Sequence, residues 1–153
     1  MKIILINKGG NMADNDHRRK GFVSIENYWG EEVQSIIIVH HSGKMEKTEG
    51  FVKNIKHGEK EKDVFHFYYQ TGLFSPKNTW KVIVITINGD VYETDGYFSC
   101  SIADSDKGVT VIGINGDTKT AYVSFPESGS CSDKLIRVKR HSLFDAQLER
   151  YLR

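Results

Sequence analysis

The side chains best suited to chemistry in this chain are its histidines, and there are six of them: His17, His40, His41, His57, His66 and His141. His40 and His41 are neighbours at the end of a β-branched run that predicts a strand, so they point to opposite faces and cannot bind one metal ion together. Either of them could act with His66 and an acid in an enzyme. Histidines without a metal-binding spacing more often bond to nearby backbone. We therefore predict no metal site and no catalytic residue, and a histidine-dependent enzyme is the weakest of three hypotheses.

The segment 104–108 offers a second set of possible ligands. Asp104 and Asp106 lie two residues apart and Gly108 follows, as at the start of a calcium-binding loop. A third oxygen ligand at the proper position and the downstream bidentate Glu are missing. Loops rich in Asp and Gly have this composition for conformational reasons alone. We expect a turn here, and the sequence implies no cofactor, because it also lacks a glycine-rich phosphate loop and a GxSxG motif.

An aromatic strand followed by an amphipathic loop is the most informative stretch of the sequence. Alternation along the strand places Phe65, Phe67 and Tyr69 on one face and His66 and Tyr68 on the other. The loop that follows carries large apolar side chains near a lysine, a combination suited to a membrane interface or to a sugar-like ring. The alternative is that the loop folds back and Phe74 closes the end of the core, since most large apolar side chains are buried.

We predict that this loop is the binding edge of the protein. Rigid aromatic side chains contribute a large contact area at low entropy cost, and a neighbouring lysine attracts anionic headgroups. The anchors in this hypothesis are Tyr68, Phe74 and Trp80, with Lys77 as the polar partner. The full set of predicted binding residues is Tyr68, Tyr69, Thr71, Gly72, Phe74, Lys77 and Trp80.

The elements that position these residues read as strands. Short runs rich in β-branched and aromatic residues recur along the chain, separated by turn residues, and no βαβ alternation occurs. The pairs Asn88-Gly89 and Asn115-Gly116 predict type I′ hairpins over 79–98 and 108–125, adjacent in the fold. The prediction is an all-β, single-domain, two-sheet β-sandwich of about eight or nine antiparallel strands with a short C-terminal helix.

The two ends of the chain differ from this central pattern. Residues 1–20 read as a flexible N-terminal arm, with an edge strand over 2–7 as the alternative. Residues 21–141 form the β-sandwich domain. Residues 142–153 read as an amphipathic helix, capped by Ser142, with its apolar side chains on one face. The apolar run over 1–6 is too short for a secretory or transmembrane segment, so we expect a soluble protein and leave its compartment open.

Composition and charge narrow the functional classes. The chain has 153 residues, of which 39% are hydrophobic, and a formal net charge of +1. That length suits one domain, and the charge balance removes the electrostatic case for a nucleic-acid binder. Lysines and arginines gather from residue 134 onward, either as a second binding surface or as the protective charge of an edge strand.

The two cysteines, Cys100 and Cys131, allow one disulfide or two free thiols. No CxxC or zinc pattern surrounds them. Both lie near predicted strand ends, so they could come within bridging distance. The sequence leaves the choice between a bridge and free thiols open.

Several short motifs resemble the "Up-regulated in Daf" domain family in order and approximate spacing, over about residues 22–131. They are Val23-Ser24-Ile25-Glu26-Asn27, Val39-His40-His41-Ser42, Tyr69-Gln70-Thr71-Gly72 and Trp80-Lys81-Val82. The stretch His66-Phe67-Tyr68, followed by residues 75–80, is also similar to a segment of the aegerolysins. Those are small acidic β-sandwich proteins that bind membrane lipids and can assist pore formation, whereas this chain is close to neutral.

Together these features predict a non-enzymatic binding module that binds membrane lipid and is toxin- or defence-like. The alternative is a protein- or glycan-recognition module with no membrane role. Neither hypothesis involves nucleic acid, and the sequence leaves the oligomeric state open.

Overall fold

The structure, a computed structural model, describes residues 2–7 and 18–139. The strands are β1 (Lys2–Asn7), β2 (Arg19–Tyr28), β3 (Val33–Ser42), β4 (Thr48–Ile55), β5 (Lys60–Tyr69), β6 (Asn78–Thr86), β7 (Val91–Thr94), β8 (Phe98–Ser99), β9 (Val109–Asn115), β10 (Thr120–Phe125) and β11 (Gly129–Val138). A single 3₁₀ turn, η1 (Asp104–Asp106), precedes β9. The all-β prediction is confirmed. The helix predicted over 142–153 lies outside the described residues, and β1 occupies part of the expected N-terminal arm.

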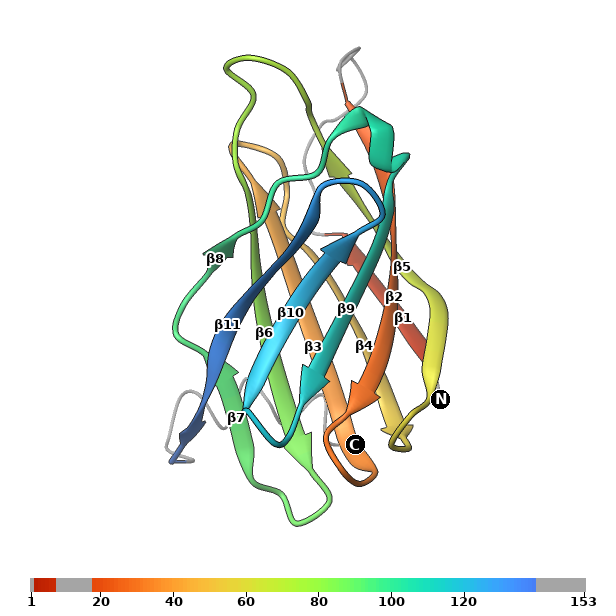
Figure 1. The fold of residues 1–153 in the computed structure, drawn as a ribbon, viewed down its shortest axis with the longest axis vertical. Coiled ribbons are helices and arrows are strands. Elements are labelled where there is room, and N and C mark those ends of the chain that lie inside the picture. Colours follow the sequence, from red (N-terminus) through yellow and green to blue (C-terminus); the bar gives the residue numbers. More distant parts are fainter. Residues whose placement is uncertain (1, 8–17, 140–153) are drawn as a thin grey trace.

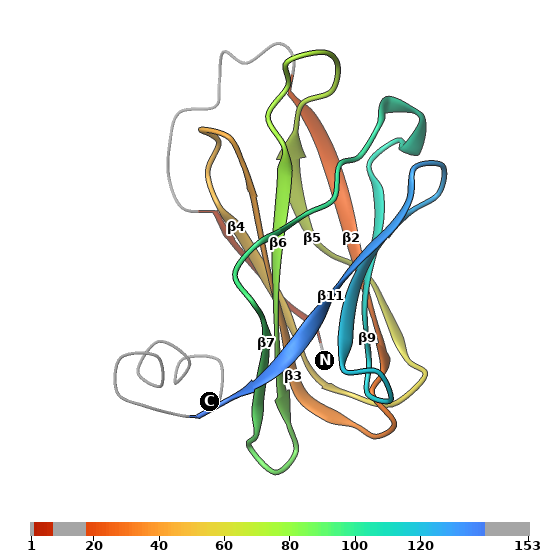
Figure 2. The same ribbon diagram turned by 60° about the vertical axis from the view of Figure 1, so that its left-hand side comes forward.

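The predicted two-sheet sandwich is wrong, because the strands form one continuous sheet. Its order is β1-β4-β3-β6-β7-β11-β10-β9-β2-β5, with β8 paired to β6. The sheet curls until β5 comes close to β4 and β1, which gives a nearly closed, barrel-like shape (Figures 1 and 2). The long strand β11 carries the sheet around the bend. Its residues up to Lys134 pair with β10, and from Leu135 onward it pairs with β7.

One pair of neighbouring strands departs from the expected antiparallel arrangement. Strands β2 and β9 run parallel, from Phe22 beside Val109 to Tyr28 beside Asn115. A parallel pair needs a long crossover connection, which local turn signals do not reveal. The two predicted hairpins are also not adjacent, because β11 lies between β7 and β10.

The barrel interior is filled by the inner faces of both halves of the sheet. The predicted alternation of β5 is confirmed, since Phe65, Phe67 and Tyr69 are buried in one core cluster with Trp80. A Cβ at Gly50 of β4 would lie 2.2 Å from Cδ1 of Phe65. The ring of Phe65 therefore lies directly on the backbone of β4, and this contact closes the barrel between β4 and β5.

The Asn88-Gly89 hairpin between β6 and β7 is confirmed, but its type I′ geometry is not. Only Gly89 has a positive φ, 87°. Its N–H donates to the Thr86 carbonyl at 2.9 Å, and the Thr86 N–H donates to the Asp90 carbonyl at 2.9 Å. This is a three-residue loop that ends in one left-handed residue, a common hairpin type that needs a glycine only at its last position.

The Asn115-Gly116 hairpin between β9 and β10 uses its two residues differently. The Asn115 side chain accepts from the N–H groups of Asp117 and Thr118, at 2.9 and 3.2 Å. The left-handed residue of this turn is Lys119, with φ 52°. Gly116 is required by close approach instead, because a Cβ there would lie 1.8 Å from the Trp29 carbonyl oxygen.

Cys100 and Cys131 form a disulfide, with their Cα atoms 5.8 Å apart. The bridge joins β11 to the irregular segment between β8 and β9. The prediction that these residues come within bridging distance is confirmed. Among the described residues, no helix is both long and apolar enough to cross a membrane.

Candidate functional site

The candidate site lies at the end of the barrel where β5 ends and β6 begins (Figure 1). A hollow of about 400 Å³ opens there between two walls. Residues 70–72 and 75–78 form one wall, and residues 101–104 form the other. The turn between β3 and β4 lies alongside, since a Cβ at Gly43 would be 2.7 Å from Cβ of Pro76. Segments distant in sequence therefore build one surface.

The tip of the β5–β6 loop projects beside this hollow. Leu73 and Phe74 are 85% and 96% exposed, so Phe74 does not close the end of the core. The N–H and hydroxyl of Ser75 both donate to the Gly72 carbonyl, at 3.2 and 2.6 Å. Phe74 also has a positive φ, 69°. A left-handed backbone costs a residue other than glycine about 1–2 kcal/mol, and such strain tends to gather at functional positions.

The predicted binding residues divide into three places. Thr71, Gly72 and Lys77 line the hollow, with Phe74 at the tip beside them. Tyr69 and Trp80 are buried in the core instead. Their position allows them to support the loop, but not to contact a partner at the surface. Tyr68 lies on the outer face of β5, where Cζ of Arg18 is 4.5 Å from its ring centroid.

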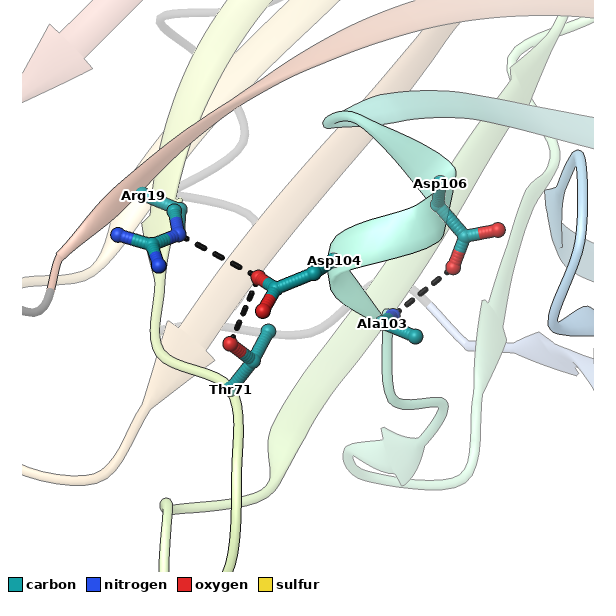
Figure 3. Close-up of polar contacts among 5 residues, drawn as sticks. All are labelled: Arg19, Thr71, Ala103, Asp104 and Asp106. Atoms are coloured by element: carbon teal, nitrogen blue, oxygen red, sulfur yellow. Dashed lines mark hydrogen bonds and ion pairs between the residues drawn. The ribbon is translucent and has the colours of Figure 1, made fainter.

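Asp104 is the charged centre of the second wall (Figure 3). Its Oδ1 accepts from the Thr71 hydroxyl at 2.7 Å and from Nε of Arg19 at 3.3 Å. The Thr71 hydrogen bond is the main cause that holds the pKa of Asp104 below its ordinary value, and the Arg19 guanidinium adds to it. Asp104 therefore remains ionised and links β2, the β5–β6 loop and η1. Sequence reasoning missed this role, because its partners lie 33 and 85 residues away.

Asp106 fixes the position of the same wall. Its buried carboxylate accepts from the N–H of Ala103 at 2.8 Å, which Figure 3 also shows, and from the N–H groups of Glu127 and Ser128 at 2.7 and 3.0 Å. The Ser128 hydroxyl donates as well. Burial alone would raise the pKa of Asp106, but these hydrogen bonds outweigh it and lower the pKa. The segment 104–108 is thus the expected turn, and the hydrogen bonds of Asp106 connect it to the β10–β11 turn.

The family model described as "Up-Regulated in long-lived daf-2" matches residues 17–148. The chain belongs to this family. The predicted resemblance is therefore confirmed, whereas nothing in the comparisons supports the aegerolysin likeness of the aromatic segment. The description of the family names no activity. A comparison with curated proteins finds no match.

In this member of the family the matched span includes the tip, both walls of the hollow and the disulfide. It also includes the histidines that sequence reasoning singled out.

His40 points into the barrel, where its Nε2 lies 2.9 Å from Oδ1 of Asn78 and its ring packs on Phe67 and Trp80, with centroids 4.5 Å apart in each case. Burial lowers the pKa of His40 from 6.5 to about 4, so the ring is neutral near pH 7.

Neither His41 nor His66 joins His40. His66 lies on the outer face of β5, where its ring packs edge-on against Phe22 at 5.0 Å. His41 lies on the opposite face of β3 from His40. The structure therefore does not bring His66 together with His40. Among the described residues, no three His, Cys, Asp or Glu side chains are arranged to hold a metal ion.

Proposed function

We propose that this protein is a non-enzymatic binding module that docks on a lipid membrane surface through the tip of its β5–β6 loop. The observation that carries the proposal is the pair of large apolar side chains at that tip, Leu73 and Phe74, which are 85% and 96% exposed. Removing a large apolar side chain from water is worth about 1.5–3 kcal/mol. Insertion of the tip into the interfacial region of a bilayer would recover that free energy.

The backbone at the tip supports the same function. Phe74 combines an exposed aromatic ring with a left-handed φ of 69°. The left-handed backbone costs stability, since glycine would satisfy the turn without strain, and the exposed ring recovers none of that cost because it is not buried in the fold. A residue that is strained and gains no burial in the fold is best explained by a benefit in a bound state.

Three exposed lysines around the tip favour an anionic membrane. Lys77 on the same loop and Lys44 and Lys47 on the neighbouring β3–β4 turn are exposed. Nζ of Lys47 lies 5.5 Å from the ring centroid of Tyr97, which is partly exposed. Each lysine held near an anionic surface contributes about 1 kcal/mol. A toxin- or defence-like role is the setting that we propose for such binding.

Co-sedimentation with vesicles tests this proposal. The full chain should sediment with vesicles of phosphatidylcholine and phosphatidylserine, and Phe74→Ala should weaken that binding about tenfold or more, in line with the loss of a buried aromatic ring. Ile87→Ala is the matched control, because Ile87 is an exposed apolar residue in the β6–β7 turn at the opposite end of the barrel. Equal loss in both variants, or no binding at all, would rule out docking through the tip. Failure to bind vesicles would favour the alternative, a module that recognises a protein or a glycan without a membrane.

A further inference from the structure

The hollow at the base of the tip has a lining unlike that of the tip itself. Its walls carry the hydroxyl groups of Thr71, Ser75 and Ser101. The Thr71 and Ser75 hydroxyls already donate, to Asp104 and to the Gly72 carbonyl, so their oxygens are left as acceptors. A hydroxyl oxygen whose hydrogen is already donated can still accept hydrogen bonds. The Asp104 carboxylate and the Lys77 ammonium group are the charged groups of the lining. A volume of about 400 Å³ is typical of a site for a small molecule.

The two charged groups of the lining, Asp104 and Lys77, have opposite signs. Asp104 is already paired with the Arg19 guanidinium at 3.3 Å, so its remaining hydrogen-bonding capacity, rather than its charge, is what it offers a ligand. The lining is therefore best matched to a ligand that is polar and uncharged, with several groups that donate hydrogen bonds. A sugar ring has these properties, since each of its hydroxyls can donate one.

Asp104 is held ready for such a ligand. Its Oδ1 is fixed by the Thr71 hydroxyl at 2.7 Å and by Arg19 Nε at 3.3 Å, which sets the orientation of the whole carboxylate. An ionised carboxylate accepts about four hydrogen bonds, so acceptor capacity remains for hydroxyls of a sugar. Hydrogen bonds to a charged acceptor are about twice as strong as those between neutral groups. The carboxylate is thus the strongest recognition element of the lining.

The hollow and the tip are parts of one loop. Gly72 and Ser75 line the hollow, and Leu73 and Phe74 project from between them. When the tip inserts into the interfacial region of a bilayer, the hollow comes to face the headgroup layer. We propose that it binds the hexose headgroup of an uncharged glycolipid, an inference that rests on the proposed membrane function. A free sugar would offer the same hexose ring. The position of the tip beside the hollow favours a lipid as the source of that ring.

Vesicles that differ only in their headgroup test the inference. The full chain should bind phosphatidylcholine vesicles containing a monohexosylceramide about tenfold more tightly than the same vesicles containing ceramide, the gain expected from a few additional hydrogen bonds. Asp104→Asn should abolish that preference while keeping binding to phosphatidylserine vesicles at equal or higher affinity, because it removes a negative charge from the face that meets the anionic surface. Asp117→Asn, which removes an exposed carboxylate from the β9–β10 turn at the far end of the barrel, is the matched control. Equal binding to both kinds of vesicle, or an Asp104→Asn protein that keeps the preference, would overturn the inference.

A second variant and a soluble probe keep the test decisive. Thr71→Val removes the hydroxyl that orients Asp104 while keeping the side-chain volume, and it should reduce the hexose preference severalfold; a full preference in this variant would also count against the inference. Thermal unfolding checks that both variants fold. If the protein binds phosphatidylserine vesicles but shows no hexose preference, the proposed membrane function stands and the hollow is not a glycolipid site. Binding to a free methyl hexoside but to no vesicle would support the site as a sugar site, and would reject both the lipid source and membrane docking.

Discussion

The indole N–H of Trp80 donates a hydrogen bond to the carbonyl oxygen of Cys100 at 3.0 Å. Trp80 is fully buried in the barrel core, and Cys100 directly precedes residues 101–104, which form the second wall of the hollow. The disulfide from Cys100 to Cys131 fixes the same point to β11. A core side chain and a covalent bridge therefore hold one end of this wall, and Asp106 holds the other through its hydrogen bonds to Glu127 and Ser128.

Loss of the disulfide should destabilise the protein and loosen the wall. The bridge closes a loop with a sequence separation of 31 residues. In the chain-entropy model such a loop stabilises the fold by about 3–4 kcal/mol. Urea unfolding of a Cys100→Ser, Cys131→Ser double variant should show that loss in the free energy of unfolding. The wild type measured with a thiol reductant should match the variant, and an unchanged unfolding midpoint in both would contradict the prediction.

His40 should make the protein sensitive to acid. The buried ring has a pKa of about 4, below its ordinary value of 6.5, so the unfolded chain binds a proton that the folded chain does not. Full stability is therefore present above pH 6.5 and falls as the pH drops towards 4. The difference between the two pKa values corresponds to about 3 kcal/mol. Asp104 and Asp106 have pKa values below the ordinary carboxyl value of 3.8, so their contribution to stability is present above pH 3.8 and is lost only as the pH falls below it.

Urea unfolding at several pH values measures this effect. His40→Gln should remove most of the decline between pH 6.5 and 4, whatever its effect on stability at pH 7. The exposed His57, whose Nδ1 accepts from the Gly30 N–H at 3.0 Å, supplies the control His57→Gln, which should keep the decline. A wild-type protein equally stable at pH 6.5 and pH 4 would show that His40 does not control acid stability.

The two Asn-Gly turns should respond differently to the same substitution. Gly89→Ala places a side chain at a φ of 87° and should cost about 1 kcal/mol. Gly116→Ala needs no left-handed backbone, but its Cβ would lie 1.8 Å from the Trp29 carbonyl oxygen. Either the β9–β10 turn or the Trp29 backbone must then move, so the cost should be larger. The difference in thermal midpoint between the two variants measures this order, and the opposite order would contradict it.

Local sequence signals located these turns but could not determine their geometry. The alternation of β5 and the loop after it were also predictable, because periodicity and turn residues act over a few positions, whereas the sequence left open whether Phe74 is exposed or buried. The parallel pairing of β2 with β9 and the turn of the sheet through β11 depend on contacts across the whole chain. The hydrogen bond from Arg19 to Asp104, which joins β2 to η1 across 85 residues, also depends on such contacts. A single sequence carries no local trace of such contacts.

The tip residue supplies the sharpest prediction, because the backbone and the side chain of Phe74 can be tested separately. Alanine usually stabilises a protein relative to glycine by about 0.5–1 kcal/mol, since glycine has more conformational freedom to lose on folding. At a φ of 69° this order should reverse, so Phe74→Gly should melt at a higher temperature than Phe74→Ala. Both variants lack the ring, so both should lose vesicle binding to the same extent. Ile87, which has no positive φ, provides the control pair, and its alanine variant should be the more stable of the two. If Phe74→Ala instead loses about 3–5 kcal/mol, as core phenylalanines do, the ring supports the fold and the tip is not a docking element.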